Sequence, residues 1–137
     1  MSIEKIMSKT VVTVEMNDPL SVIKHIFENT KFHHLLVVER GKLVGVISDR
    51  DLLRAISPKV DTPVESARDI ATLNKKAHQI MSRKVITLPP SAGIYQAISI
   101  FNNYNVSCIP ITDEDEVQKV LGILSWRDIF RALEENR

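Results

Sequence analysis

The sequence predicts an α+β protein built from one unit that occurs twice. Each copy has the order strand, helix, strand, strand, helix, and a pseudo-twofold axis relates the two copies. Residues 45–56 recur as residues 122–133, and every position is identical or apolar for apolar except Asp49, whose counterpart is Trp126. In both copies an apolar run reaches a serine and then changes to apolar residues spaced three and four apart. This change is typical of a strand that leads into an amphipathic helix.

The duplication extends back to the start of the chain. Residues 6–14 recur as residues 80–88, so that Met7 and Met81 lie 74 residues apart. The serines that precede the two helices lie 77 residues apart. We assign the additional residues of the second copy to the acidic turn at 113–116, because a hairpin loop tolerates insertion.

These offsets divide the chain into a first repeat at residues 1–56, a linker at 57–76 and a second repeat at 77–137. Each repeat is too short to bury a good core alone, so we expect both to contribute to one compact domain.

The elements of the two repeats follow from local patterns. β-Branched runs favour strands, continuous aliphatic runs favour buried strands, and Asp18 followed by Pro19 is typical of a helix start. In the first repeat we predict a helical turn at 2–7, strands at 11–14, 35–39 and 43–48, and helices at 19–29 and 49–56. In the second we predict strands at 85–88, 109–112 and 120–125, and helices at 94–101 and 126–134.

The linker has a helix signal of its own. Thr62 is followed by a proline and, three residues on, by Glu65, which is the pattern of a capped helix start. We therefore expect a packed helix over residues 63–73, with Val64, Ile70 and neighbouring apolar residues in contact with the repeats.

Composition excludes several classes of function. The 137 residues are 44% hydrophobic and 26% charged, which is ordinary for a globular protein, and the net charge of +1 gives no overall field for nucleic acid or an anionic membrane. No apolar run is long enough to span a membrane, and the lone Cys108 cannot form an intrachain disulfide, so we expect a cytoplasmic protein. Cys108 lies in an apolar strand, where a buried inert thiol is expected.

Each repeated helix begins with a serine followed three residues later by an aspartate: Ser48 with Asp51, and Ser125 with Asp128. One interpretation is a capping box, in which the two side chains satisfy backbone amides at the helix start. The other is a ligand site, because the positive end of a helix attracts anions and a carboxylate can accept hydrogen bonds from a ribose.

Each repeat resembles the CBS domain, named for cystathionine β-synthase, so that the chain resembles a tandem pair of CBS domains. The resemblance rests on the Ile-Met-Ser-x-x-Val-x-Thr start, the helix, the apolar strand, the turn and the Gly-apolar-apolar-Ser-x-x-Asp end. The resemblance covers nearly the whole chain apart from the linker. The long linker and the Phe32-His33-His34-Leu35 stretch are similar to those of stand-alone CBS pairs of the acetoin-utilisation type.

This resemblance implies a groove between the repeats in which each repeat offers one nucleotide position. In it Asp51 and Asp128 would bind ribose, while Ser48 and Ser125 would hold phosphate. The base would be bordered by Thr13, His34 and Leu35 in the first repeat and by Thr87, Ile109 and Pro110 in the second. The cations that could neutralise phosphate are Arg50 and Arg127, with Lys9, Arg83 and Arg131. Each of them could instead be an ordinary solvent-exposed surface residue.

The two positions differ in sequence. The second repeat has Pro110 where the first has Leu36, and Trp126 could stack on a base or cover the groove. We therefore favour the second position. His33 and His34 are adjacent, so a strand would point them to opposite faces, and we expect no metal site. The sequence offers no nucleophile with a general base, so we expect no catalysis and no catalytic cofactor.

The predicted function is a regulatory module that binds an adenine nucleotide such as AMP, ADP or ATP, or S-adenosylmethionine, and signals to an effector protein or through dimer rearrangement. We expect a homodimer that uses apolar helix faces, with Ile23, Phe27, Ile98, Phe101 and Phe130 as the candidate contacts. The alternative is a ligand-free structural or protein-interaction module in which the caps are only caps.

Overall fold

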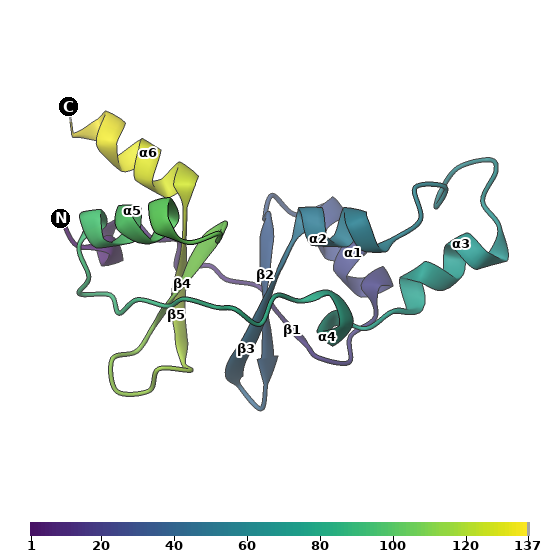
Figure 1. Cartoon of the computed structure of the whole chain (residues 1–137), viewed down its shortest axis with the longest axis horizontal. Coiled ribbons are helices and arrows are strands. Elements are labelled where there is room, and N and C mark those ends of the chain that lie inside the picture. The colour runs from purple at the N-terminus through teal and green to yellow at the C-terminus, as the bar shows by residue number, and fades with distance from the viewer. Residues whose placement is uncertain (137) are drawn as a thin grey trace. The chain divides into compact units, whose positions relative to one another are not determined.

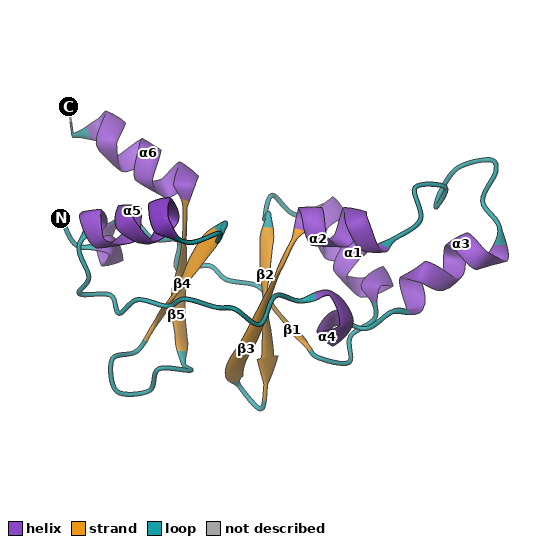
Figure 2. Ribbon diagram, in the orientation of Figure 1, coloured by secondary structure: helices purple, strands orange, loops and turns teal. Residues whose placement is uncertain are grey.

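The structure of the protein, a computed structural model, describes residues 1–136 and divides into two compact units. The repeat-one unit comprises Val12–Arg40 and Val44–Arg83, and the repeat-two unit comprises Met1–Val11, Gly41–Leu43 and Lys84–Arg137. Both units combine helices with strands, so the predicted α+β class is confirmed (Figure 2).

The repeat-one unit contains most of a three-stranded sheet in the order β1-β2-β3 (Figure 1). Its elements are β1 (Thr13–Glu15), α1 (Leu20–Asn29), β2 (His34–Glu39), β3 (Lys42–Ser48) and α2 (Asp49–Ala55). Strand β1 runs parallel to β2, with Thr13 opposite Leu36. Arg40 and Gly41 both have positive φ in the turn between β2 and β3. Buried apolar side chains, including Leu20, Ile23, Leu35, Ile47 and Leu52, form the core.

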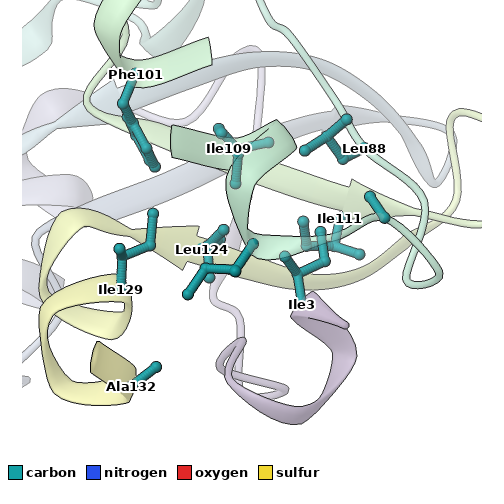
Figure 3. Close-up of a cluster of buried hydrophobic side chains, with 11 residues drawn as sticks. Ile3, Leu88, Phe101, Ile109, Ile111, Leu124, Ile129 and Ala132 are labelled. Carbon is teal, nitrogen blue, oxygen red and sulfur yellow. The ribbon is translucent and has the colours of Figure 1, made fainter. Parts of the chain in front are cut away.

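The repeat-two unit is built around an antiparallel pair of strands. Its elements are the 3-10 helix η1 (Ile3–Lys5), α5 (Ile94–Asn103), β4 (Cys108–Thr112), β5 (Val120–Ser125) and α6 (Trp126–Glu135). Figure 3 shows Ile3 of η1 gathered with side chains of the β4–β5 pair, of α5 and of α6. Ile3, Ile109, Ile111 and Leu124 in this cluster have no exposed surface.

The strand predicted at residues 85–88 is wrong: only Leu88 pairs there, in an isolated parallel bridge with Ile111. The first repeat shows why. In it the Leu36 amide donates to the Val12 carbonyl (3.1 Å), which extends the pairing. The counterpart of Leu36 is Pro110, which has no N–H to donate, so the pairing cannot extend in the same way.

The Met-Ser segment of each repeat packs in the unit that holds the strand–helix motif of the other repeat. Ser8 and Ile123 exchange two backbone hydrogen bonds of 2.9 Å, and Ser82 and Val46 exchange two of 2.8 and 3.0 Å. The sequence repeats and the compact units therefore do not coincide. The boundaries assigned to the repeats at 57 and 77 stay a prediction about the duplication.

The linker helix begins later than predicted. Helix α3 spans Ala67–Ala71 and continues into η2 (Thr72–Asn74), while α4 (Ala77–Ile80) leads into the second repeat. The side chain of Glu65 accepts from the Asp61 amide (3.0 Å) in a turn, so it does not close a box on Thr62. The cap is formed instead by Ser66 and Asp69.

The predicted contacts of the linker's apolar residues are also largely wrong. Val64 is 68% exposed and Ile70 is 48% exposed, and α3 buries no residue. Polar bonds hold the segment instead: the Ser57 hydroxyl donates to Asp69 (2.7 Å), and the Ser57 amide donates to the Thr72 hydroxyl (3.0 Å).

Candidate functional site

The Ser48–Asp51 motif forms a capping box at the junction of β3 and α2. The Ser48 amide donates to Oδ2 of Asp51 (2.8 Å), and the Asp51 amide donates to Oγ of Ser48 (3.1 Å). Both residues are half-buried. The capping interpretation is therefore correct for the first repeat. It leaves acceptor capacity on the carboxylate, because a carboxylate has about four lone-pair sites.

The Ser125–Asp128 motif forms the corresponding arrangement between β5 and α6. Both the amide and the hydroxyl of Ser125 donate to Oδ2 of Asp128, at 2.9 and 3.1 Å. The other carboxylate oxygen, Oδ1, lies 3.9 Å from Nη1 of Arg131, one turn further along the helix. The side chain of Asp128 is only 12% exposed, so its two oxygens are held in a defined orientation.

The first repeat has a feature that sequence reasoning missed: a link between His33 and Asp49. The Asp49 amide donates to the His33 carbonyl (3.0 Å), and Nδ1 of His33 lies 2.9 Å from Oδ2 of Asp49. These two contacts join the segment before β2 to the first residue of α2. The only signal in the sequence was the mismatch of Asp49 with Trp126 between the two copies.

His34, the next residue, is half-buried at the start of β2. Burial lowers the pKa of its imidazole, because removal from water disfavours the charged form. The carboxylates of Asp49 and Asp51 act in the opposite direction, and His33 adds to the lowering of this pKa. His34 is therefore a neutral ring at physiological pH, able to donate from one nitrogen and accept at the other.

Trp126 packs on the helical side of the repeat-two unit. Its ring centroid lies 4.8 Å from that of Phe101 in α5 and 5.7 Å from that of Phe130 in α6. The side chain is thus part of an aromatic row on α5 and α6, where it keeps 38% of its surface exposed. A base-stacking role for Trp126 would require it to leave these contacts.

Strand pairing places several of the predicted site residues, or their neighbours in the sequence, close to one another within each unit. In the repeat-two unit Ser125 is opposite Cys108, next to Ile109, and the amide of Leu88, next to Thr87, donates to the Pro110 carbonyl (3.3 Å). In the repeat-one unit Thr13 is opposite Leu36, which follows His34 and Leu35. Arg50 and Arg127 are exposed, two residues after the capping serines.

Three of the predicted base contacts have buried side chains. Leu35, Ile109 and Pro110 each have less than 2% of their surface exposed, and Leu35 and Ile109 belong to the apolar cores of their units. Only the backbone of these residues is suited to meet a ligand. The half-buried Thr87 and His34 and the exposed Thr13 are better placed to offer side chains.

Within residues 1–136 no three His, Cys, Asp or Glu side chains are grouped so that they could hold a metal ion. Burial raises the pKa of the Cys108 thiol to about 12, which suits an inert core residue. None of the helices in the same residues is long and apolar enough to cross a membrane.

The order of elements, the duplication and the paired strand–helix junctions define a tandem-repeat protein with one candidate half-site per repeat. The chain belongs to the CBS domain family, which it matches twice, over residues 3–58 and 77–135. The family resemblance predicted from the sequence is thereby confirmed.

Among proteins of similar sequence, the uncharacterized protein MJ1426 of Methanocaldococcus jannaschii is 30% identical, and the match covers 97% of this chain and 91% of that protein. An L-aspartate semialdehyde sulfurtransferase of Methanosarcina acetivorans is also 30% identical. The match covers 96% of this chain but only 23% of the sulfurtransferase. The chain thus spans about a quarter of that relative's length.

Two solved structures extend the comparison. The CBS domain pair of protein MJ0100, in complex with 5′-methylthioadenosine and S-adenosyl-L-methionine, has a TM-score of 0.80 and 26% identity, and the match covers 100% of this chain and 98% of that one. An acetoin utilization protein (AcuB) from Vibrio cholerae has a TM-score of 0.77 and 22% identity, with 99% and 91% covered. The second likeness shows a shared fold alone.

Proposed function

We propose that the chain is a regulatory module that binds an adenosine-containing ligand at each repeat and does not itself catalyse a reaction. The observation that carries this proposal is the likeness of the whole chain to the MJ0100 domain pair, which is in complex with two adenosyl compounds. In each half-site, Asp51 or Asp128 would bind the ribose, with Ser48 or Ser125 and the adjacent arginine near the 5′ group.

The capping geometry is compatible with this role. Each aspartate commits Oδ2 to the cap, which fixes the carboxylate, and Oδ1 is then oriented to accept from hydroxyl groups. An aspartate that caps and binds at once would also explain why the same spacing occurs in both repeats.

A first experiment identifies the ligand. Thermal denaturation is measured with AMP, ADP, ATP, NADH, 5′-methylthioadenosine and S-adenosylmethionine, one at a time. A compound present at one hundred times its dissociation constant should add about 2.7 kcal/mol to the free energy of unfolding if it binds only the folded state. No shift with any compound would favour a ligand-free interaction module and contradict the proposal.

A second experiment tests the residues. Asp128→Asn should weaken the affinity of the second half-site by about tenfold to a hundredfold, because it replaces a charge-assisted hydrogen bond worth about 1.5 to 3 kcal/mol. Asp51→Asn tests the first half-site in the same way. Calorimetric titration of both variants is the measurement, and unchanged affinity with lowered stability would mean that these aspartates are only caps.

We also propose that the module acts as a homodimer, and the structure changes the residues expected at its interface. Ile23 and Phe101 are buried in the cores of their units and are not available for contact. On α6 an apolar row remains exposed: Trp126 (38%), Phe130 (60%) and Leu133 (44%). Sedimentation at micromolar concentration should give a dimer that Phe130→Glu weakens. A wild-type species of only 15.5 kDa would contradict this.

A further inference from the structure

The helices α2 and α6 differ by one charge where the two half-sites would hold the 5′ group of a ligand. Their first seven residues carry arginine at the same two positions, Arg50 and Arg54 in one and Arg127 and Arg131 in the other, and aspartate at the same third position. The first position differs, because α2 begins with Asp49 and α6 begins with Trp126.

Asp49 is held in place at the start of α2. Its side chain is 42% exposed, its Oδ2 lies 2.9 Å from Nδ1 of His33, and its amide is bonded to the His33 carbonyl. This carboxylate directly follows Ser48, the residue that would lie next to a phosphate. A second negative charge, on Asp51, lies two residues further along the helix.

The amides at the start of α2 are also largely committed. The Ser48 amide donates to Asp51, the Asp49 amide to the His33 carbonyl, and the Asp51 amide to Ser48 Oγ. A phosphate at this position would meet a fixed carboxylate and would find few backbone donors in exchange. The cost would be the repulsion between like charges at a short distance.

We propose that Asp49 is a specificity-determining residue that makes the first half-site select adenosine compounds without a 5′ phosphate, whereas the second half-site, with Trp126 in its place, accepts the phosphorylated ligand. This inference rests on the proposed function, since it concerns the ligands of the same two half-sites. The two half-sites would then bind different adenosine compounds, one without and one with a 5′ phosphate.

The test is an NMR titration of the full chain with AMP and, separately, with 5′-methylthioadenosine, which has no phosphate. The backbone amide signal of Asp51 reports the first half-site and that of Asp128 reports the second. In the wild type, 5′-methylthioadenosine should bind the first half-site more tightly than AMP. Asp49→Asn should reduce this preference by about fivefold to tenfold, as expected for the loss of one partly exposed charge near a phosphate dianion.

Two further variants complete the experiment. Trp126→Asp should transfer the preference, lowering AMP affinity at the second half-site with little effect on 5′-methylthioadenosine. Glu39→Gln, which removes an exposed charge at the end of β2, is the matched control and should leave both ratios unchanged. The amide spectrum of each variant shows directly whether it is folded.

The outcomes separate the two proposals. If both compounds bind but Asp49→Asn leaves their affinity ratio at the first half-site unchanged, the specificity role is wrong and the proposed function stands. If AMP binds the wild-type first half-site more tightly than 5′-methylthioadenosine, the specificity role is again overturned. If neither compound shifts either amide at millimolar concentration, this inference is overturned, and the proposed function is then decided by the thermal denaturation with the other four compounds.

Discussion

A carbon atom at the Cβ position of Gly122 would lie 2.7 Å from the carbonyl oxygen of Ser8, closer than such atoms approach in folded proteins. Ser8 and Ile123, the neighbour of Gly122, exchange two backbone hydrogen bonds at this point. The glycine that opens the strand–helix motif of the second repeat is therefore required by a segment from the first. Gly45 has the same relationship to Ser82, at 3.1 Å.

The two glycines give a matched pair of variants. Gly122→Ala should lower the free energy of unfolding of the repeat-two unit by about 1 to 3 kcal/mol, because the nearest atom belongs to the backbone and cannot turn aside. Gly45→Ala should cost less, because its closest neighbour, Sδ of Met81 at 2.6 Å, belongs to a flexible side chain.

Urea unfolding followed by fluorescence of the single tryptophan, Trp126, measures the first of these effects, since this residue lies in the repeat-two unit. Circular dichroism follows both variants. Gly93→Ser is the control, because the nearest atom to a Cβ at Gly93 is 4.0 Å away and serine is a good N-cap for α5. Equal losses for Gly45→Ala and Gly122→Ala would contradict the ranking.

The N-terminal turn should be essential to the repeat-two unit although it precedes the first repeat. Ile3 is fully buried in that unit, and its amide donates to the Ala92 carbonyl (2.9 Å). Ile3→Ala should therefore destabilise the unit by about 2 to 5 kcal/mol, the cost of a cavity in a core. Ile70→Ala on the exposed face of α3 should change stability by less than about 0.5 kcal/mol. Urea unfolding followed by circular dichroism compares the two variants, because Ile70 lies in the repeat-one unit and Ile3 in the repeat-two unit. Similar small effects would mean that the turn is not part of the core.

The fold could be predicted from the sequence because its elements follow from local periodicity. The duplication showed the same order of elements twice, and helix α1 begins at Leu20, one residue later than the predicted start at Pro19. The exchange of Met-Ser segments could not be predicted, because a repeated sequence does not determine which copy an N-terminal segment joins. The absence of a strand at 85–88 could be predicted only in part. The sequence shows that Pro110 has no N–H to donate, but it does not show that residues 85–88 would need this N–H for their pairing.

The candidate site likewise has features that could be predicted from the sequence and features that could not. The Ser–Asp spacing predicted the capping boxes, because three residues on from a cap is the one position whose side chain reaches back. His33 escaped notice because its partner Asp49 is sixteen residues distant, and only the return of β3 alongside β2 brings them together. For Trp126 the sequence left two alternatives, stacking on a base or covering the groove, and neither included the contact with Phe130, four positions along the helix.

The order of the linker should depend on Asp69. Its carboxylate accepts from the Ser57 hydroxyl (2.7 Å) and from the Ser66 amide (2.8 Å), so it joins the start of α3 to the end of the first repeat. Asp69→Ala should expose residues 57–66 to thermolysin, with cleavage at least several times faster than in the wild type. Arg68→Ala, at an exposed position of the same helix, is the control. Rapid cleavage of the native wild type within this segment would show that these bonds do not hold it.

The last prediction concerns the pH dependence that His34 gives to stability. Because burial lowers the pKa of His34 in the folded chain from the usual value of 6.5, the unfolded chain takes up a proton at a higher pH than the folded chain does. Stability should therefore be full above about pH 6.5, fall as the pH decreases below that value, and stop falling at the lowered pKa of the folded state.

His34→Gln removes this contribution. As the pH is lowered from 7.5 to 5, the wild type should therefore lose more unfolding free energy than the variant does. Urea unfolding at half-unit pH steps gives this difference, and an NMR titration of the His34 ring gives its pKa directly. A constant difference across the range would mean that His34 takes up its proton equally in both states. Burial at the start of β2 would then have no effect on its charge.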